Sequence, residues 1–395
     1  MKKYSKPILL IYSLLTFTAS QAQWEKLADI PEKLTFPVVT VLNGKIHVMG
    51  GGGTGGATDV HYRYHPETNT WDTLAPVPYK VQQPAGCAVA GRIHYFGGGF
   101  PNSGSPVASH YSYNPANNTW RKETNLTAAR AIHYAVELND TLYSIAGQGM
   151  KNLFQAYDTF SKKWINRADL LDDNYWYGAH VSTHGKIYRF GGGGSGAPKL
   201  DAHVYDPKIK TWSILPEMPE RIHGLGGSAF GDSVYFGGGY ASGNEFDKVW
   251  IFNLKTEQYI NGPTLPSARD YLKFVTIGKC IYSVGGNSNS NANIPLSLIR
   301  HCPGITVEVE SHIKNNEQIV VKTPPGKLKV ELLTVTQPIK ITLTDMAGRN
   351  LFSQIYPVDS PQNLEIETSN FRNGIYVLTI SYNTSIYNQR IFINN

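Results

Sequence analysis

Charged residues are scarce in this sequence: Asp, Glu, Lys and Arg make up 17% of its 395 residues, against roughly 25% in an average soluble domain. Without Lys2, Lys3 and Lys6, which lie in an N-terminal segment considered below, the formal net charge falls from +6 to +3. So small an excess gives no reason to expect a nucleic-acid partner. Low charge with 38 glycines and 24 tyrosines favours a β-rich fold over a coiled coil or a disordered acidic chain.

Cysteine is also scarce, and its three positions, Cys87, Cys280 and Cys302, cannot form a dense disulfide framework. None of them belongs to a Cys-x-x-Cys pair, and no Cys/His cluster has a spacing typical of zinc sites. We therefore expect neither a metal nor another cofactor.

No apolar run in the sequence reaches the roughly 20 residues that a membrane-spanning helix needs. The apolar stretch over 7–19 follows the basic segment MKKYSK and precedes Ser20-Gln21-Ala22, which together form the three-part pattern of a secretory signal. We expect a signal peptide over 1–22, cleaved before Gln23. The mature protein would then lie outside the cytoplasm and have no membrane span.

A repeat of nearly fifty residues organises the chain from residue 24 to 302. A glycine doublet after an apolar run recurs six times, once degraded to SIAGQ, and its first glycines are Gly50, Gly97, Gly147, Gly191, Gly237 and Gly285. A large aromatic residue recurs in phase with it, at Trp24, Trp71, Trp120, Trp164, Trp212 and Tyr259. Two markers in phase over six copies indicate a repeat architecture.

Each copy predicts four short β-strands, here named a to d. In the second copy they cover 86–90, 93–96, 109–113 and 119–122, with turn signals between a and b and between c and d. The length of the copies varies mainly in the segment after the doublet, which is rich in Gly, Ser and Asn. Such a composition is typical of surface loops.

This pattern resembles the kelch repeat, and the resemblance implies an all-β six-bladed propeller over 23–302 with one four-stranded blade per copy. The sixth copy has no Trp-bearing strand d, whereas Trp24 begins the mature chain with a strand d that has no blade before it. We expect the Trp24 strand to complete blade six, because this closes the ring and removes two open sheet edges.

The same blade predicts one disulfide bond. If Val284 of strand b faces Leu298 of strand c, the antiparallel register places Cys280 opposite Cys302. Directly opposed residues are close enough for a disulfide.

The repeat stops after Cys302, and we expect a linker over 303–316 and a separate domain over 317–395. Short alternating strands divided by turn residues predict a small immunoglobulin-like β-sandwich there. The segments IKITLTDMAGRNL, FRNGIYVLTI and QRIFI resemble the type A C-terminal sorting domain of the type IX secretion system. The residues of this sequence that match the pattern of that family are Asp345, Gly348, Gly374, Tyr376 and Arg390. The family's usual Pro-Asn-Pro start is altered to Pro324-Pro325-Gly326.

The sorting-domain resemblance implies a source and an address. The source would be a Bacteroidetes-type bacterium, and the chain would pass through the periplasm to the type IX machinery. The final location would be secreted or on the outer cell surface. In such systems the sorting domain is commonly cleaved or exchanged for a surface anchor.

One face of the predicted disc carries a candidate ligand site. Strand a begins on the face where strand b ends, so the d–a connections and the variable b–c loops share that face. The residue 14 positions before each doublet predicts the mouth ring of Phe36, Gln83, His133, Tyr177, His223 and Tyr271. The candidate ligand-binding residues are Gln83, His133, Trp176, Tyr177, Arg221, His223, Arg269 and Tyr271. Such side chains suit a sugar or an extended peptide, although aromatic residues there also suit a packed plug.

The sequence favours a monomeric binding module for a glycan or protein ligand over an enzyme. Other secreted six-bladed kelch proteins are sialic-acid mutarotases, so a carbohydrate-active enzyme is the alternative. Glu220 and His223 would supply its acid and base groups. Kelch propellers that are copper-radical oxidases need a Cys–Tyr crosslink, and none of the three cysteines has a motif that supports one.

Overall fold

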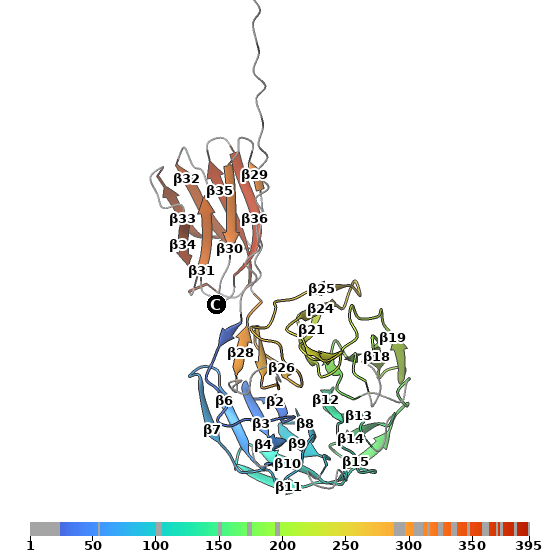
Figure 1. Cartoon of the computed structure of the whole chain (residues 1–395). Helices are drawn as coiled ribbons and strands as arrows, with labels where there is room; N and C mark the ends of the chain where they lie inside the picture. The colour runs from blue at the N-terminus through green and yellow to red at the C-terminus, as the bar shows by residue number, and fades with distance from the viewer. Residues whose placement is uncertain are drawn as a thin grey trace, which may run out of the picture. The chain divides into compact units, whose positions relative to one another are not determined.

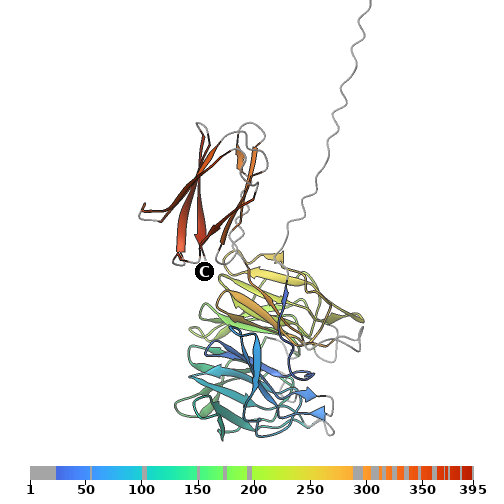
Figure 2. The ribbon, with the colours of Figure 1, turned by 90° about the vertical axis from the view of Figure 1, so that its left-hand side faces the viewer.

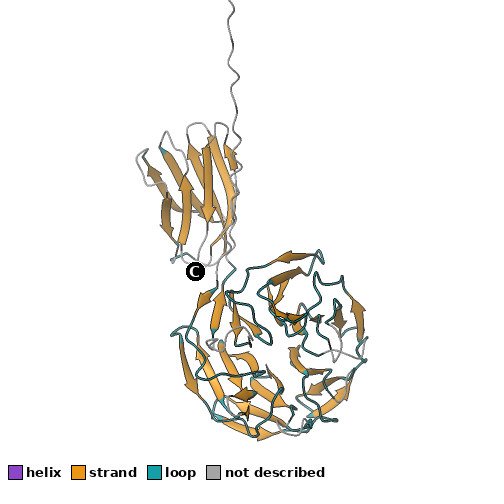
Figure 3. Cartoon of the chain, in the orientation of Figure 1, coloured by secondary structure: helices purple, strands orange, loops and turns teal. Residues whose placement is uncertain are grey.

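The computed structural model divides the chain into two compact units, one up to His301 and one from Cys302 onward. It describes residues 24–53, 56–99, 105–148, 152–171, 176–193, 198–287, 297–303, 311–313, 317–322, 327–332, 338–345, 348–357, 363–368, 370–371, 374–382 and 385–393. The expected signal peptide and the Pro324-Pro325-Gly326 segment lie outside these residues. All regular elements in the described ranges are strands (Figure 3). Among these residues there is accordingly no helix long and apolar enough to span a bilayer.

The first unit contains six four-stranded antiparallel sheets, which form the blades of the propeller. Each blade is given from its inner to its outer strand. Blade one contains β2 (Val38–Leu42), β3 (Lys45–Met49), β6 (His61–His65) and β7 (Thr70–Thr73), and blade two contains β8 (Ala85–Val89), β9 (Arg92–Phe96), β10 (His110–Asn114) and β11 (Thr119–Lys122). Blade three contains β12 (Tyr134–Leu138), β13 (Thr141–Ile145), β14 (Phe154–Asp158) and β15 (Lys163–Asn166). Blades four and five are β16 (Ala179–Thr183), β17 (Lys186–Phe190), β18 (Ala202–Asp206), β19 (Thr211–Ile214); and β20 (Gly226–Phe230), β21 (Ser233–Gly237), β24 (Val249–Asn253), β25 (Tyr259–Asn261).

The inner strands contact one another in the cyclic order β2, β8, β12, β16, β20, β26 and back to β2. The sheets therefore surround one central axis (Figure 1). Two small hairpins extend the loops after the second strand: β4 (Gly52–Gly53) with β5 (Gly56–Ala57), and β22 (Tyr240–Ala241) with β23 (Asn244–Glu245). The all-β six-bladed propeller that the repeat predicted is confirmed.

Blade six joins the two ends of the propeller. It contains β26 (Lys273–Ile277), β27 (Cys280–Val284), β28 (Leu298–His301) and, as its outer strand, β1 (Glu25–Lys26). Figure 2 shows β1, in dark blue, beside the orange strands of this sheet. The Leu27 amide donates to the Leu298 carbonyl at 2.9 Å, and Glu25 forms an ion pair with Arg300 at 2.5 Å.

In five of the six blades, the aromatic residue at the outer strand donates a hydrogen bond to the chain just after the preceding blade. Trp24 is buried in blade six, and its indole Nε1 donates to the Pro263 carbonyl beyond blade five at 3.1 Å. The same bond recurs from Trp71 to Ala28 at 3.0 Å, from Trp120 to Ala75 at 3.0 Å, from Trp164 to Thr124 at 3.1 Å and, through a phenol, from Tyr259 to Pro216 at 2.7 Å. Trp212 is the exception in blade four, because its buried Nε1 has no protein partner.

Two consecutive residues with positive φ end the second strand of each blade. They are Gly50–Gly51, Gly97–Gly98, Ala146–Gly147, Gly191–Gly192, Gly238–Gly239 and Gly285–Gly286. The second position needs glycine, since a Cβ on Gly51 would lie 2.5 Å from the Thr35 carbonyl oxygen. The doublets predicted to begin at Gly147 and Gly237 are thus wrong by one residue: Ala146 begins the third, and Gly237 still belongs to β21.

Blade six also carries the bonded cysteines. Its register pairs Val284 with Leu298 and Ile281 with His301. Cys280 and Cys302, the next residue along each strand, are both disulfide-bonded. Cys87 is a buried free thiol in β8, and burial raises its pKa.

The second unit is a β-sandwich of two four-stranded sheets. One sheet holds β29 (Ser311–Ile313), β30 (Glu317–Lys322), β31 (Lys327–Leu332) and β34 (Asn363–Glu367), and the other β33 (Asn350–Tyr356), β32 (Ile339–Asp345), β35 (Gly374–Tyr382) and β36 (Ser385–Ile393). Alternate residues of β31, β32, β34 and β35 form one apolar core between them. The segment 303–316 was expected to be a linker, but it contains β29. The backbone of β29 pairs with β30, so β29 belongs to the sandwich.

The predicted sorting-motif residues belong to one sheet, and two of them lie where the chain turns from β32 to β33. Gly348 has φ +80° and its amide donates to the Asp345 carbonyl at 2.9 Å. The Asp345 carboxylate accepts from the Arg349 amide at 3.0 Å and from its Nε at 2.7 Å. Tyr376 pairs with Asp345 across the sheet and packs in the core. Gly374 lies in β35 and Arg390 in β36.

Buried histidine pairs join the second and third strands of the first two blades. His47 Nδ1 lies 2.9 Å from His61 Nε2, and His94 Nδ1 lies 2.8 Å from His110 Nε2. Burial lowers the pKa of His47 and His110 to about 4 and of His61 and His94 to about 3. Each pair is therefore held as two neutral imidazoles at neutral pH.

We expect the indole bond of Trp24 to stabilise the closed ring. Trp24→Phe keeps most of the packing but removes the donor to Pro263, at a cost of about 1 kcal/mol, and Trp24→Ala costs about 3–5 kcal/mol. Trp212→Phe is the matched control, because its Nε1 has no partner to lose. Urea unfolding of the mature protein measures both. Equal losses for the two Phe variants would contradict this role.

We also expect acid to destabilise the propeller before carboxylates protonate. Above pH 6.5 the four buried histidines are neutral in both the folded and the unfolded state, so their burial carries no penalty for protonation. Below pH 6.5 these histidines take up protons in the unfolded chain but not in the folded state, where their pKa values are about 3–4. Proton uptake therefore favours the unfolded chain, and the stability of the fold decreases. Thermal melts between pH 8 and 4.5 test this. A melting temperature that stays constant from pH 7 to pH 5 would contradict it.

Candidate functional site

The residue two positions before each inner strand forms a ring at the mouth of the propeller. Its members all have positive φ, between 54° and 74°, and are Phe36, Gln83, Ile132, Tyr177, Gly224 and Tyr271. Backbone bonds connect neighbouring members: Ile132 N to Gln83 O at 3.2 Å, Gly224 N to Tyr177 O at 2.7 Å and Tyr271 N to Gly224 O at 2.8 Å. Large residues with positive φ are strained and persist where the surroundings fix them.

This ring corrects the predicted one in blades three and five. His133 and His223 each lie one residue from the ring position, because the doublets of those copies were placed one residue off. His133 is buried, and its Cε1 lies 2.3 Å from where a Cβ on Gly97 would be, so the ring packs between blades two and three. Burial holds its pKa well below the usual range.

Three ring members form an aromatic cluster over the central axis. The ring centroids of Phe36 and Tyr271 are 4.4 Å apart, those of Tyr177 and Tyr271 4.8 Å, and those of Phe36 and Tyr177 5.9 Å. Gln83 Nε2 donates to the Tyr177 hydroxyl at 3.2 Å. All four side chains are partly exposed, so the cluster both plugs the opening and offers aromatic surface.

Gly224 is the one ring member without a side chain, and Asp270 and Tyr271 lie close to its Cα. A Cβ there would meet Asp270 Cβ and Tyr271 N at 3.3 Å. Asp270 is buried with its Oδ1 unpartnered, and burial, reinforced by Glu245, raises its pKa to about 7. His223 stacks on Tyr240 of β22, with centroids 5.6 Å apart, and neither of its ring nitrogens has a protein partner.

The remaining predicted residues separate into surface and structural positions. Trp176 is partly exposed and its Nε1 has no protein partner, and Arg221 is exposed. Arg269 is buried, contrary to its predicted place at the mouth. Its guanidinium donates to Ser297 Oγ at 2.6 Å and Ser267 Oγ at 2.7 Å, so it fixes a loop and is not available to a ligand.

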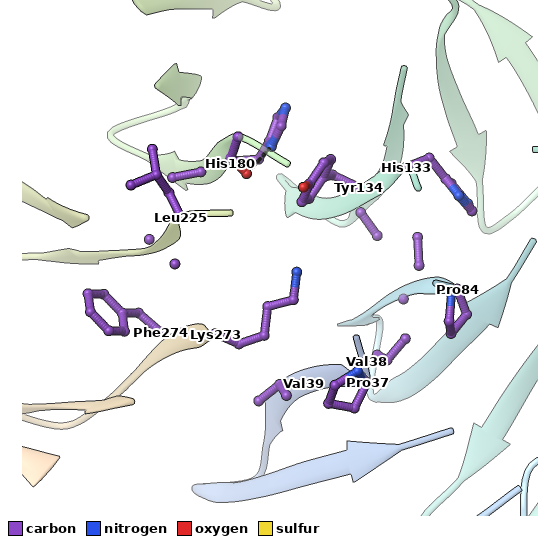
Figure 4. Close-up of a pocket in the computed structure, with 17 residues that line it drawn as sticks. Pro37, Val38, Val39, Pro84, His133, Tyr134, His180, Leu225, Lys273 and Phe274 are labelled. Carbon is purple, nitrogen blue, oxygen red and sulfur yellow. Dashed lines mark hydrogen bonds between the residues drawn. The ribbon is translucent and has the colours of Figure 1, made fainter. Parts of the chain in front are cut away.

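A cavity of about 110 Å³ lies in the central channel (Figure 4). Its polar side chains include Tyr134, His180 and Lys273, none of which the sequence analysis selected. A smaller cavity of about 20 Å³ adjoins it and is lined by Tyr134 and Lys273 together with Phe36, Gln83 and Tyr177 of the mouth ring. Among the described residues, no group of three His, Cys, Asp or Glu side chains is arranged to hold a metal ion.

Six four-stranded sheets around one channel define a six-bladed β-propeller. The KLHDC2/KLHL20/DRC7 Kelch-repeats domain matches residues 85–286 and the Kelch motif matches residues 34–78. The chain therefore belongs to the kelch-repeat family. The secretion system C-terminal sorting domain matches residues 325–394, which confirms the resemblance of the C-terminal domain.

Curated relatives share the kelch region. The chain is 26% identical to Kelch-like protein 36 of Rattus norvegicus over 184 residues (44% of this chain, 30% of that protein). It is 33% identical to Kelch-like protein 23 of Homo sapiens over 92 residues (22% and 16%), and 26% identical to Alpha-scruin of Limulus polyphemus over 204 residues (47% and 22%). The matches thus span less than a third of these relatives.

A solved structure shares the fold. The structure of YjhT superposes with a TM-score of 0.59 at 14% identity, covering 75% of this chain and 97% of that one.

Proposed function

We propose that this chain is an exported kelch propeller that binds a glycan at the mouth formed by the d–a connections and b–c loops. The sorting domain implies secretion or a place on the outer surface. The type IX machinery is the corresponding export partner. A protein segment in extended conformation is the other ligand that such a mouth suits.

The observation that carries the proposal is a group of buried polar atoms without protein partners at the mouth. They are both ring nitrogens of His223, Nε1 of Trp176 and Oδ1 of Asp270. Buried polar atoms in folded proteins are nearly always hydrogen-bonded, so these atoms are suited to a polar ligand or to water. The aromatic rings of Tyr177 and Tyr271 lie beside His223 and suit the apolar face of a sugar.

A carbohydrate-active enzyme is the second candidate, and one observation favours it. The pKa of Asp270, raised to about 7 by burial, is matched to general acid–base catalysis at neutral pH. Opening and closing a sugar ring needs only such a group in the correct position. Asp270 therefore takes the role of the acid that the sequence analysis gave to Glu220, because Glu220 forms an ion pair with Lys248 at 2.9 Å.

A glycan array on the mature protein, followed by NMR of sugar anomerisation, tests both candidates. Burial lowers the pKa of His223, so we expect His223→Ala to weaken binding by about 0.5–1.5 kcal/mol, the range for neutral hydrogen bonds, and Asp270→Asn by about 1.5–3 kcal/mol if its carboxylate is charged. Lys208→Ala is the control, since Lys208 is exposed in a c–d turn on the opposite face. Full binding by both mouth variants would refute this site. Anomer exchange that Asp270→Asn abolishes would indicate the enzyme instead.

Export is tested by removing residues 304–395. The two units have separate cores, so we expect the propeller to fold and to accumulate in the periplasm of a type IX-competent host. Cell fractionation and surface proteolysis measure its location. A truncated protein that reaches the cell surface in normal amount would contradict the role of the sorting domain.

A further inference from the structure

The first residues of the six inner strands are among those that line the cavity in the central channel. These are Val38, Ala85, Tyr134, Ala179, Gly226 and Lys273. Four of them have small side chains, which leaves room for the cavity of about 110 Å³. Tyr134 and Lys273 project into that space, and the Lys273 amino group points toward Tyr134 (Figure 4).

Lys273 has no counter-ion in this cavity. Its Nζ lies 5.0 Å from the centroid of the Tyr134 ring, and none of the described residues that line the cavity is acidic. Burial lowers its pKa to about 8, so the amine is still mostly protonated at neutral pH. Lys273 is partly exposed, and a partly desolvated ammonium group favours a partner of opposite charge.

The neighbours of Lys273 are themselves fixed in position. The Tyr134 ring stacks on His180, with centroids 4.0 Å apart and an interplanar angle of 21°. His180 Nδ1 lies 3.2 Å from the Gly178 carbonyl oxygen, which selects the tautomer with the proton on Nδ1. Burial keeps the pKa of His180 well below its usual range, so Lys273 is the one cationic side chain among the described lining residues.

We infer that the channel is a binding site for a carboxylate, held by the ammonium of Lys273 and the phenol of Tyr134. The smaller cavity shares these two residues with Phe36, Gln83 and Tyr177 of the mouth ring. The carboxylate is therefore either a free small acid or the acid group of a sugar that lies at the mouth. The site does not depend on glycan binding, because a small acid needs only the channel.

Binding of acetate, glucuronate and glucose to the full mature protein, measured by calorimetry in low salt at pH 7, tests this site. We expect an acid to bind and Lys273→Met, which keeps the chain length but not the charge, to weaken that binding at least tenfold. Lys122→Met removes an exposed lysine from β11 and is the matched control. Binding of acetate and glucuronate supports a free-acid site, and binding of glucuronate alone supports an acidic sugar.

Stability separates loss of the site from loss of the fold. Lys273→Met removes a partly desolvated cation that has no counter-ion among the described lining residues, so its melting temperature should not fall while acid binding does. Tyr134→Phe keeps the ring that stacks on His180 and removes only the phenol, and it should also weaken acid binding. The inference is overturned if neither acid binds the wild type at millimolar concentration, if glucose binds as well as glucuronate, or if Lys273→Met binds acids normally.

Discussion

The pairing of β1 with β28 is the interaction on which the rest of the propeller depends. It joins residues at opposite ends of the repeat region, Lys26 with Ile299 and Glu25 with Arg300. Trp24 adds an indole bond to blade five, and the same bond recurs at four other blades. In the closed ring the inner strands β2 and β26 are neighbours, and together they complete the wall of the channel and of its mouth.

Closure constrains the mouth because each ring residue must fit between two blades. Five of the six ring positions hold side chains in a backbone conformation that glycine prefers, and inter-blade backbone bonds fix several of them. The exception, Gly224, has no side chain, and Asp270 and Tyr271 pack closely against it. The blades are thus equivalent in backbone and different in side chains, so a symmetric scaffold presents an asymmetric surface.

The repeat was sufficient to predict the all-β propeller, because the glycine turns and the outer aromatic residues recur with a steady spacing. It was insufficient for the mouth. The sequence pattern identified the glycine doublets, but the turn after the second strand is defined by two consecutive residues with positive φ. In blade three the first of these two residues is Ala146, which is not a glycine. That shift replaced Ile132 and Gly224 by two histidines in the predicted ring. Lys273 was missed because only the closed ring shows that its strand position faces the channel. The ligand and the signal peptide remain predictions.

Amide hydrogen exchange of Leu27 tests the closed ring most directly. Its amide donates to Leu298 O at 2.9 Å, as the equivalent amides of Leu74 and Leu215 donate to His61 O at 2.8 Å and Ala202 O at 2.9 Å. If β1 belongs to blade six, Leu27 exchanges as slowly as Leu74 and Leu215 in the mature protein, within about tenfold. Exchange of Leu27 at the rate of an unstructured peptide, with Leu74 and Leu215 protected, would contradict the closed propeller.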